Sequence, residues 1–197
     1  ESPVWELMGN RFHLWSIEQG TEDKDLQLYD DLRTCVYEAY PQGNASSVDL
    51  YKLVSVGFSV GALFNTIILS QRSDTLAASV HISGGADLEI ATYTNPFAPF
   101  NLPTNDVPVL LFSGGEQDVW PNASFPVVNF TEGTEHLFTQ LQQNDYLAVL
   151  CKHNSGHTIT PRSYLQSIEW LTDHTYGEPS PFAEPIEDWT DWCTWSQ

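Results

Sequence analysis

Positively charged residues are scarce in this sequence of 197 residues. It has 7 lysines and arginines against 26 aspartates and glutamates, a formal net charge of −19. Nucleic-acid binding requires Lys and Arg in a patch that neutralises phosphates, so the composition excludes that class of partner. We interpret the acidity as a solvated surface that keeps the protein soluble, with binding of calcium or a cationic partner as the alternative. No EF-hand spacing supports calcium, and we expect no metal and no cofactor.

Long apolar runs are also missing. The longest apolar stretches are interrupted by Ser, Gly or Asn well short of the roughly 20 residues that a bilayer crossing requires. The first ten residues, ESPVWELMGN, lack the basic and apolar regions of a signal peptide, so any such segment has been removed or was never present. We therefore expect no membrane span.

Cysteine is rare too, with only Cys35, Cys151 and Cys193. Three cysteines permit one intrachain disulfide and leave one thiol, which we expect to be buried and free or bonded to another chain. Three Asn-x-Ser/Thr sequons are candidate glycosylation sites, beginning at Asn44, Asn122 and Asn129. Together these features favour a secreted or extracellular glycoprotein.

Apolar periodicity predicts an alternation of strands and helices. The expected strands are 11–17, 52–56, 75–83, 107–113 and 146–151, and the expected helices are 26–40, 59–69 and 164–174. Such alternation is typical of an α/β fold with a mostly parallel sheet and helices on both faces. Residues 1–177 form the expected domain, and residues 178–197 form a C-terminal tail, rich in Pro, Trp and acidic residues, that packs on the domain by its aromatics.

A long irregular loop follows the expected strand 75–83. Residues 86–106 contain three prolines and little regular pattern. Ligands of open parallel sheets bind beyond the carboxyl ends of the strands, so this loop is a candidate substrate-facing wall. A solvated connection is the alternative.

The motif Gly57-Phe58-Ser59-Val60-Gly61 stands between an apolar strand and an apolar helix. This is the context of a nucleophile elbow, in which a sharp, strained turn exposes a serine. The flanking glycines allow strand and helix to approach without a clash. A free serine hydroxyl is a poor nucleophile near neutral pH, so the motif predicts a partner base and an orienting acid.

Two later strand ends supply candidates for these roles. Asp118 follows the strand 107–113 and is our choice for the acid, with Glu116 as the competing carboxylate. His157 follows the strand 146–151 and is our choice for the base, with His153 as the alternative. The order Ser59, Asp118, His157 is the chain order of nucleophile, acid and base in α/β-hydrolases.

These stretches carry a resemblance to a known family. VGFSVGA, AASVHISGG, VPVLLFSGGEQDVWP and VLCKHNSGHTITP, with the following SIEWLTDH, are similar to serine esterases of the α/β-hydrolase superfamily. The resemblance is greatest to the polyhydroxybutyrate-depolymerase and feruloyl-esterase-like group, and it covers about half of the chain with specific motifs. It implies an esterase of the EC 3.1.1 type that uses a Ser-His-Asp triad and an acyl-enzyme, with the Val60 N–H donating to the oxyanion. The implied substrate is a small-molecule or polymeric ester.

The sequence departs from this group before the elbow. Such enzymes have several strands and a His-Gly type loop there, and the loop supplies a second oxyanion donor, whereas only 56 residues precede Gly57. Gly9-Asn10 is a weak stand-in for that loop. The chain is therefore expected to be the C-terminal part of a longer precursor whose N-terminal part stays associated or disulfide-linked. The alternative function is a catalytically inactive, hydrolase-derived module for assembly or adhesion.

Overall fold

The computed structural model describes residues 4–7, 10–13, 15–17, 20, 23–41, 48–86, 88, 98–122 and 125–196, of which 4–13, 50 and 121–127 are described by their backbone alone. The strands are β1 (Val4–Leu7), β2 (Asn10–His13), β3 (Val54–Phe58), β4 (Ala78–Ile82), β5 (Val109–Ser113), β6 (Val119–Asn122), β7 (Phe125–Asn129), β8 (Ala148–Lys152) and β9 (Cys193–Trp195). The helices are α1 (Asp23–Ala39), α2 (Val60–Arg72), α3 (Phe130–Gln143) and α4 (Pro161–Asp173).

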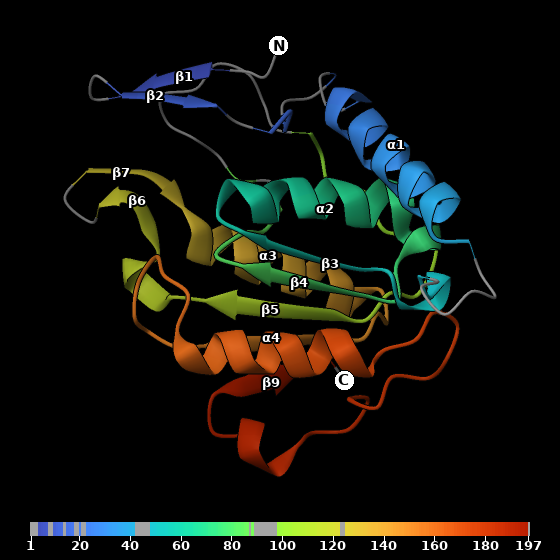
Figure 1. The fold of residues 1–197 in the computed structure, drawn as a ribbon. Helices are drawn as coiled ribbons and strands as arrows, with labels where there is room; N and C mark the ends of the chain where they lie inside the picture. Colours follow the sequence, from blue (N-terminus) through green and yellow to red (C-terminus); the bar gives the residue numbers. More distant parts are fainter. Residues whose placement is uncertain are drawn as a thin grey trace.

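The central sheet has the order β3-β4-β5-β8-β9, in which the first four strands are parallel and β9 is antiparallel. Helices α2 and α3 cover one face, while α4 and the C-terminal segment cover the other (Figure 1). The predicted fold class, a mostly parallel sheet with helices on both faces, is confirmed. Hairpins β1-β2 and β6-β7 lie outside this sheet.

Helix α2 runs through the interior, as its lack of charged residues over 59–69 predicts. Eight consecutive residues, Ala62 to Leu69, are buried. Helix α1 differs, because Leu26 is its only buried residue among those described. An ion pair between Arg72 and Asp30, 2.8 Å apart, links the two helices. The hydrogen bonds from Arg72 hold the pKa of the Asp30 carboxyl below its ordinary value.

The structure differs from the periodicity prediction at several elements. The strand expected over 11–17 ends at His13. Helix α3 and strands β6 and β7 were not predicted. The segment 178–197 is partly regular, because it contains a short 3-10 helix at Glu187–Trp189 and strand β9. Its Trp189 and Trp195 are buried against the sheet.

A disulfide joins β8 to β9, between Cys151 and Cys193. Cys35 is the remaining thiol, and it is exposed on α1, so the expectation that it is buried and free is wrong, while the alternative, a bond to another chain, stays a prediction. The disulfide closes a long loop, because its cysteines are 42 residues apart in sequence.

Removing this disulfide is expected to destabilise the fold. A double substitution, Cys151→Ala with Cys193→Ala, should lower the free energy of unfolding by about 4 kcal/mol, because the unfolded chain regains the entropy of a 42-residue loop. Urea unfolding measures this, with Cys35→Ala as the matched control that should leave stability unchanged. Equal stability of the double variant and the native protein would contradict the prediction.

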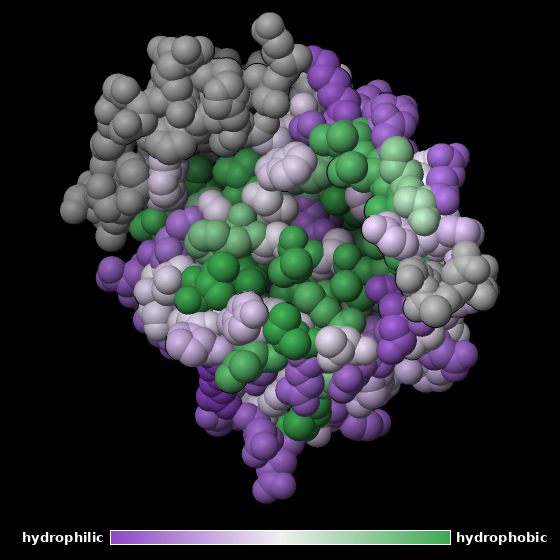
Figure 2. Space-filling view, in the orientation of Figure 1, coloured by the Kyte–Doolittle hydropathy of each residue, from purple (hydrophilic) through white to green (hydrophobic). Residues whose placement is uncertain are grey.

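Strand β3 is an open edge of the central sheet, since β4 is its one partner among the described strands. Val56 is 57% exposed there, and Leu28 and Leu32 of α1 are exposed beside it. These residues line a groove of about 390 Å³. Figure 2 shows apolar residues gathered across the middle of this face. The edge of the sheet therefore presents both unpaired backbone and apolar surface.

Candidate active site

The candidate nucleophile Ser59 lies between β3 and α2 in a left-handed backbone conformation, with φ 58° and ψ −128°. A non-glycine residue with such angles is strained and depends on its surroundings to hold it. A Cβ on Gly57 would lie 2.3 Å from the carbonyl oxygen of Gly61, so the two ends of the turn touch backbone to backbone. The strained, glycine-flanked turn predicted from the sequence is present.

Three side chains from separate strand ends meet at this turn. The His157 Nε2 atom is 3.0 Å from the Ser59 Oγ atom, and His157 Nδ1 is 2.8 Å from Asp118 Oδ1. The Asp118 side chain is fully buried, and the His157 side chain is 16% exposed. Sequence positions 59, 118 and 157 are therefore linked in one hydrogen-bonded chain.

The loops that carry Asp118 and His157 are held together by their backbones. The Gly156 N–H donates to the Gly114 carbonyl at 2.9 Å. A Cβ on Gly114 would lie 2.1 Å from the Gly156 carbonyl oxygen, so only glycine fits this contact. The Gly114 N–H also donates to Asp118 Oδ2 at 2.7 Å. The carboxylate thus accepts from a backbone amide with one oxygen and contacts His157 with the other.

The competing candidates lie outside this chain of contacts. Glu116 is exposed. His153 accepts a hydrogen bond from the Ser155 N–H through Nδ1, and burial lowers its pKa. Asp118 and His157 are therefore the acidic and basic side chains that the fold brings to Ser59.

Val60 begins helix α2 directly after Ser59. The first backbone N–H groups of a helix have no partner within it, and they lie at the positive end of the helix dipole. The role of the Val60 N–H as an oxyanion donor stays a prediction. Gly9 of the stand-in loop lies outside the described residues, and Asn10 begins β2.

Two aromatic rings that sequence reasoning missed lie on the faces of His157. Phe58 precedes Ser59, and its ring centroid is 4.8 Å from that of His157. Phe130 begins α3, and its ring stacks on the His157 ring with a centroid distance of 4.4 Å. Phe58 is one of the two variable residues of the elbow motif, so its position was visible in the sequence, whereas Phe130 reaches the site through a helix that was not predicted.

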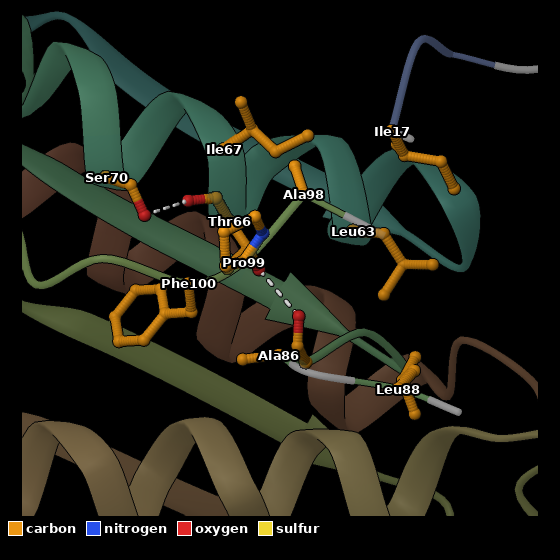
Figure 3. A pocket seen from close by; sticks show the side chains of 11 residues that line it. Ile17, Leu63, Thr66, Ile67, Ser70, Ala86, Leu88, Ala98, Pro99 and Phe100 are labelled. Carbon is orange, nitrogen blue, oxygen red and sulfur yellow. Dashed lines mark hydrogen bonds between the residues drawn. The ribbon is translucent and has the colours of Figure 1, made fainter. Parts of the chain in front are cut away.

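The loop 86–106, a candidate substrate wall, is described only at Ala86, Leu88 and from Ala98 onward. These residues pack over α2 and enclose a cavity of about 20 Å³ together with Thr66 and Ser70 (Figure 3). That volume suits one water molecule and not an ester substrate. The role of the loop as a substrate wall stays a prediction.

His81 is a fully buried histidine within strand β4. Its Nε2 is 2.9 Å from Ser79 Oγ, and its Nδ1 is 3.3 Å from both Thr66 Oγ1 and the Ala62 carbonyl oxygen. Burial lowers its pKa to about 4 from the ordinary 6.5. The imidazole is therefore neutral in the folded protein near neutral pH.

This buried histidine predicts a loss of stability in acid. Because its folded pKa lies below its unfolded value, the unfolded chain binds more protons between pH 6.5 and about 4, so stability falls as the pH drops through that window. We expect a loss of about 2 kcal/mol at pH 5 relative to pH 8 from this residue. Urea unfolding of the native protein and of His81→Gln at both pH values checks it.

The stability of His81→Gln should still fall in acid, but by less than that of the native protein, since burial also lowers the pKa values of His153 and His174. Equal losses in the two proteins would show that His81 contributes nothing to the acid sensitivity.

In the described residues, no group of His, Cys, Asp and Glu side chains is arranged to hold a metal ion. Likewise, none of the described helices is both long and apolar enough to cross a membrane.

No protein-family model and no curated protein matches the sequence. Solved structures do match the fold. A serine-to-cysteine variant of pOPH with DMSO has a TM-score of 0.65 at 20% identity, over 87% of this chain and 59% of that chain. Native sOPH has a TM-score of 0.66 at 16% identity, over 90% of this chain and 63% of that chain. The Bacillus cereus carboxylesterase has a TM-score of 0.52 at 16% identity, over 85% of this chain and 71% of that chain.

These likenesses confirm the predicted α/β-hydrolase fold. The chain spans about 60% of the length of the pOPH and sOPH chains that it matches. Nothing in the comparisons separates the polyhydroxybutyrate-depolymerase and feruloyl-esterase-like group from other esterases, so that finer resemblance stays a prediction.

Proposed function

We propose that this chain carries the catalytic centre of a serine carboxylic-ester hydrolase of the EC 3.1.1 type. The observation that carries the proposal is the hydrogen-bonded chain from Ser59 Oγ through His157 to Asp118, with contacts of 3.0 and 2.8 Å. A nucleophile within hydrogen-bond reach of a base, which is itself oriented by an acid, is the arrangement that activates a serine hydroxyl. The carboxylesterase among the fold's solved relatives supports the same substrate class.

The reaction proceeds in two halves. Ser59 Oγ attacks the ester carbonyl carbon while His157 Nε2 takes the hydroxyl proton, and Asp118 stabilises the resulting imidazolium through Nδ1–H. The tetrahedral intermediate then collapses, the C–O bond to the alcohol breaks, and His157 donates its proton to the departing alkoxide. Water attacks the acyl-enzyme with His157 again as base, which releases the carboxylic acid and restores Ser59.

The Val60 N–H donates to the oxyanion in this proposal. Charge develops on the former carbonyl oxygen only as the tetrahedral intermediate forms, so a fixed donor there stabilises the transition state more than the substrate. We propose that a second donor comes from the segment before β3, in which Gly9-Asn10 is the candidate.

A fluorophosphonate probe tests the nucleophile directly. We expect it to label the native protein at Ser59, as located by peptide mapping, because the probe reacts with activated serines. Ser70→Ala is the matched control, since Ser70 lies near the other end of α2 and should not alter labelling. Absence of label from Ser59 in the folded protein would refute the proposed function.

We further propose that the open edge of β3 receives a strand from an associated segment of the same precursor. An exposed sheet edge is a template for added strands, and α1 presents exposed apolar residues beside it. The longer chains of pOPH and sOPH are consistent with such a segment. Cys35, exposed on α1, is the candidate for a disulfide to it.

The intact mass of native material, with and without reductant, tests this association. A second chain released by reductant supports a processed enzyme linked through Cys35. A single 22.2 kDa chain without esterase activity favours the alternative, a catalytically inactive module for assembly or adhesion.

We propose a secreted or extracellular location. The Cys151–Cys193 disulfide supports it, because disulfides persist in oxidising compartments. Asn44 lies outside the described residues, Asn122 ends β6, and Asn129 caps α3 by accepting from the Glu132 N–H. A loss of mass on treatment with an N-glycosidase would identify occupied sites.

A further inference from the structure

The imidazole of His157 lies between two phenylalanine rings. The Phe58 ring is inclined by 28° to it at a centroid distance of 4.8 Å, and the Phe130 ring by 16° at 4.4 Å. Both pairs are stacked, and the two phenylalanines come from different elements, the end of β3 and the start of α3.

Each ring is tied to a neighbour of His157 in the proposed triad. Phe58 is bonded directly to Ser59 in the chain. The Phe130 N–H donates to the Asp118 carbonyl oxygen at 2.9 Å, and its side chain is buried with 2% exposure. The backbone that carries each ring is therefore linked directly to the nucleophile or the acid.

The hydrogen bonds and the rings restrain different motions of the imidazole. The contacts to Ser59 and Asp118 lie at the two ring nitrogens and fix the direction of the ring. They leave the ring free to tilt about the line between those contacts, and stacking on both faces opposes that tilt. The negative faces of aromatic rings also attract a cation within about 6 Å.

We propose that Phe58 and Phe130 form an aromatic clamp that positions His157 and stabilises the imidazolium formed during catalysis. This inference rests on the proposed function. Both phenylalanines are positioning residues, since they act on His157 and not on the ester. Leucine has a similar apolar bulk but no aromatic face, so Phe→Leu substitutions remove the stacking while retaining most of the burial.

Kinetics of Phe58→Leu and Phe130→Leu test the clamp with a p-nitrophenyl ester. Each substitution should lower kcat about tenfold with KM nearly unchanged, because the imidazolium forms only after the substrate has bound. Phe58→Tyr keeps an aromatic face at this half-buried position and should retain the native kcat. Leu102→Ala, at an exposed site, serves as the control and should leave both constants unchanged.

Proton NMR of His157 gives a readout that does not depend on turnover. Ring protons held between two aromatic faces resonate upfield, and we expect each Leu substitution to move them downfield while circular dichroism shows the fold intact. Unchanged kcat in an active Leu variant, or His157 resonances that do not move, would overturn the clamp. A native protein that lacks esterase activity yet shows the upfield resonances refutes the proposed function and leaves the clamp's positioning role supported.

Discussion

Ser59→Ala is expected to reduce kcat for ester hydrolysis by about 10⁶-fold, the scale reached when a triad serine is removed. The Oγ atom that contacts His157 Nε2 at 3.0 Å is lost, so no acyl-enzyme forms at this residue. The variant should still fold, because the alanine methyl group is smaller than the hydroxymethyl group. It keeps the positive φ that the native serine already has, so the backbone strain at residue 59 is unchanged.

The measurement is single-turnover release of p-nitrophenol, with the fluorophosphonate probe on the same preparation. Ser70→Ala, at the other end of the same helix, should match the native rate. Activity of Ser59→Ala within about tenfold of the native protein would assign the hydrolysis to another residue.

Asp118→Asn is expected to lower kcat by about 10⁴-fold with the fold intact. The native carboxylate contacts two groups. Its Oδ2 atom accepts from the Gly114 N–H, and its Oδ1 atom contacts His157 Nδ1. An asparagine side chain has one acceptor oxygen, so its amide N–H₂ must face one of these two donors. The imidazole then loses its acceptor or takes the wrong tautomer, and burial of the site keeps solvent from replacing it.

Glu116→Gln is the matched control, because it makes the same chemical change on an exposed carboxylate two residues away. It should leave kcat unchanged. A large loss in Glu116→Gln, together with a small one in Asp118→Asn, would identify Glu116 as the acid.

The sequence predicted the parallel core because its strands are short apolar runs that end in chemically distinctive turns. The Gly-x-Ser-x-Gly turn, the Asp118 loop and the His157 loop each follow such a strand, and the carboxyl ends of parallel strands lie at one edge of a sheet. The meeting of positions 59, 118 and 157 could therefore be predicted without any long-range information.

Helix α3 could not be predicted as readily, because Gly133 interrupts the helix-forming pattern of its sequence. Glycine disfavours a helix interior, yet a Cβ at this position would lie 2.5 Å from the Leu88 side chain. The glycine leaves room for the Leu88 side chain of a distant loop, and that contact is invisible in the local sequence. Phe130, and with it one face of the His157 environment, was missed for the same reason.

Strand β9 was missed because nothing local specifies it. It has three residues, and its partner β8 lies some 42 residues earlier, as the spacing of their cysteines shows. Its Trp195 side chain donates from Nε1 to the Phe182 carbonyl oxygen at 3.0 Å. Pairing and aromatic packing of this kind depend on the finished sheet.

The backbone contact between Gly114 and Gly156 has a consequence for chain-length variation. Because the Gly156 N–H bonds to the Gly114 carbonyl, the loop lengths from Ser113 to Asp118 and from His153 to His157 are matched to each other. A residue inserted into either loop alone would shift that register and separate the acid from the base. Insertions during divergence of this fold should therefore accumulate elsewhere, for example near Gly177, whose surroundings are open.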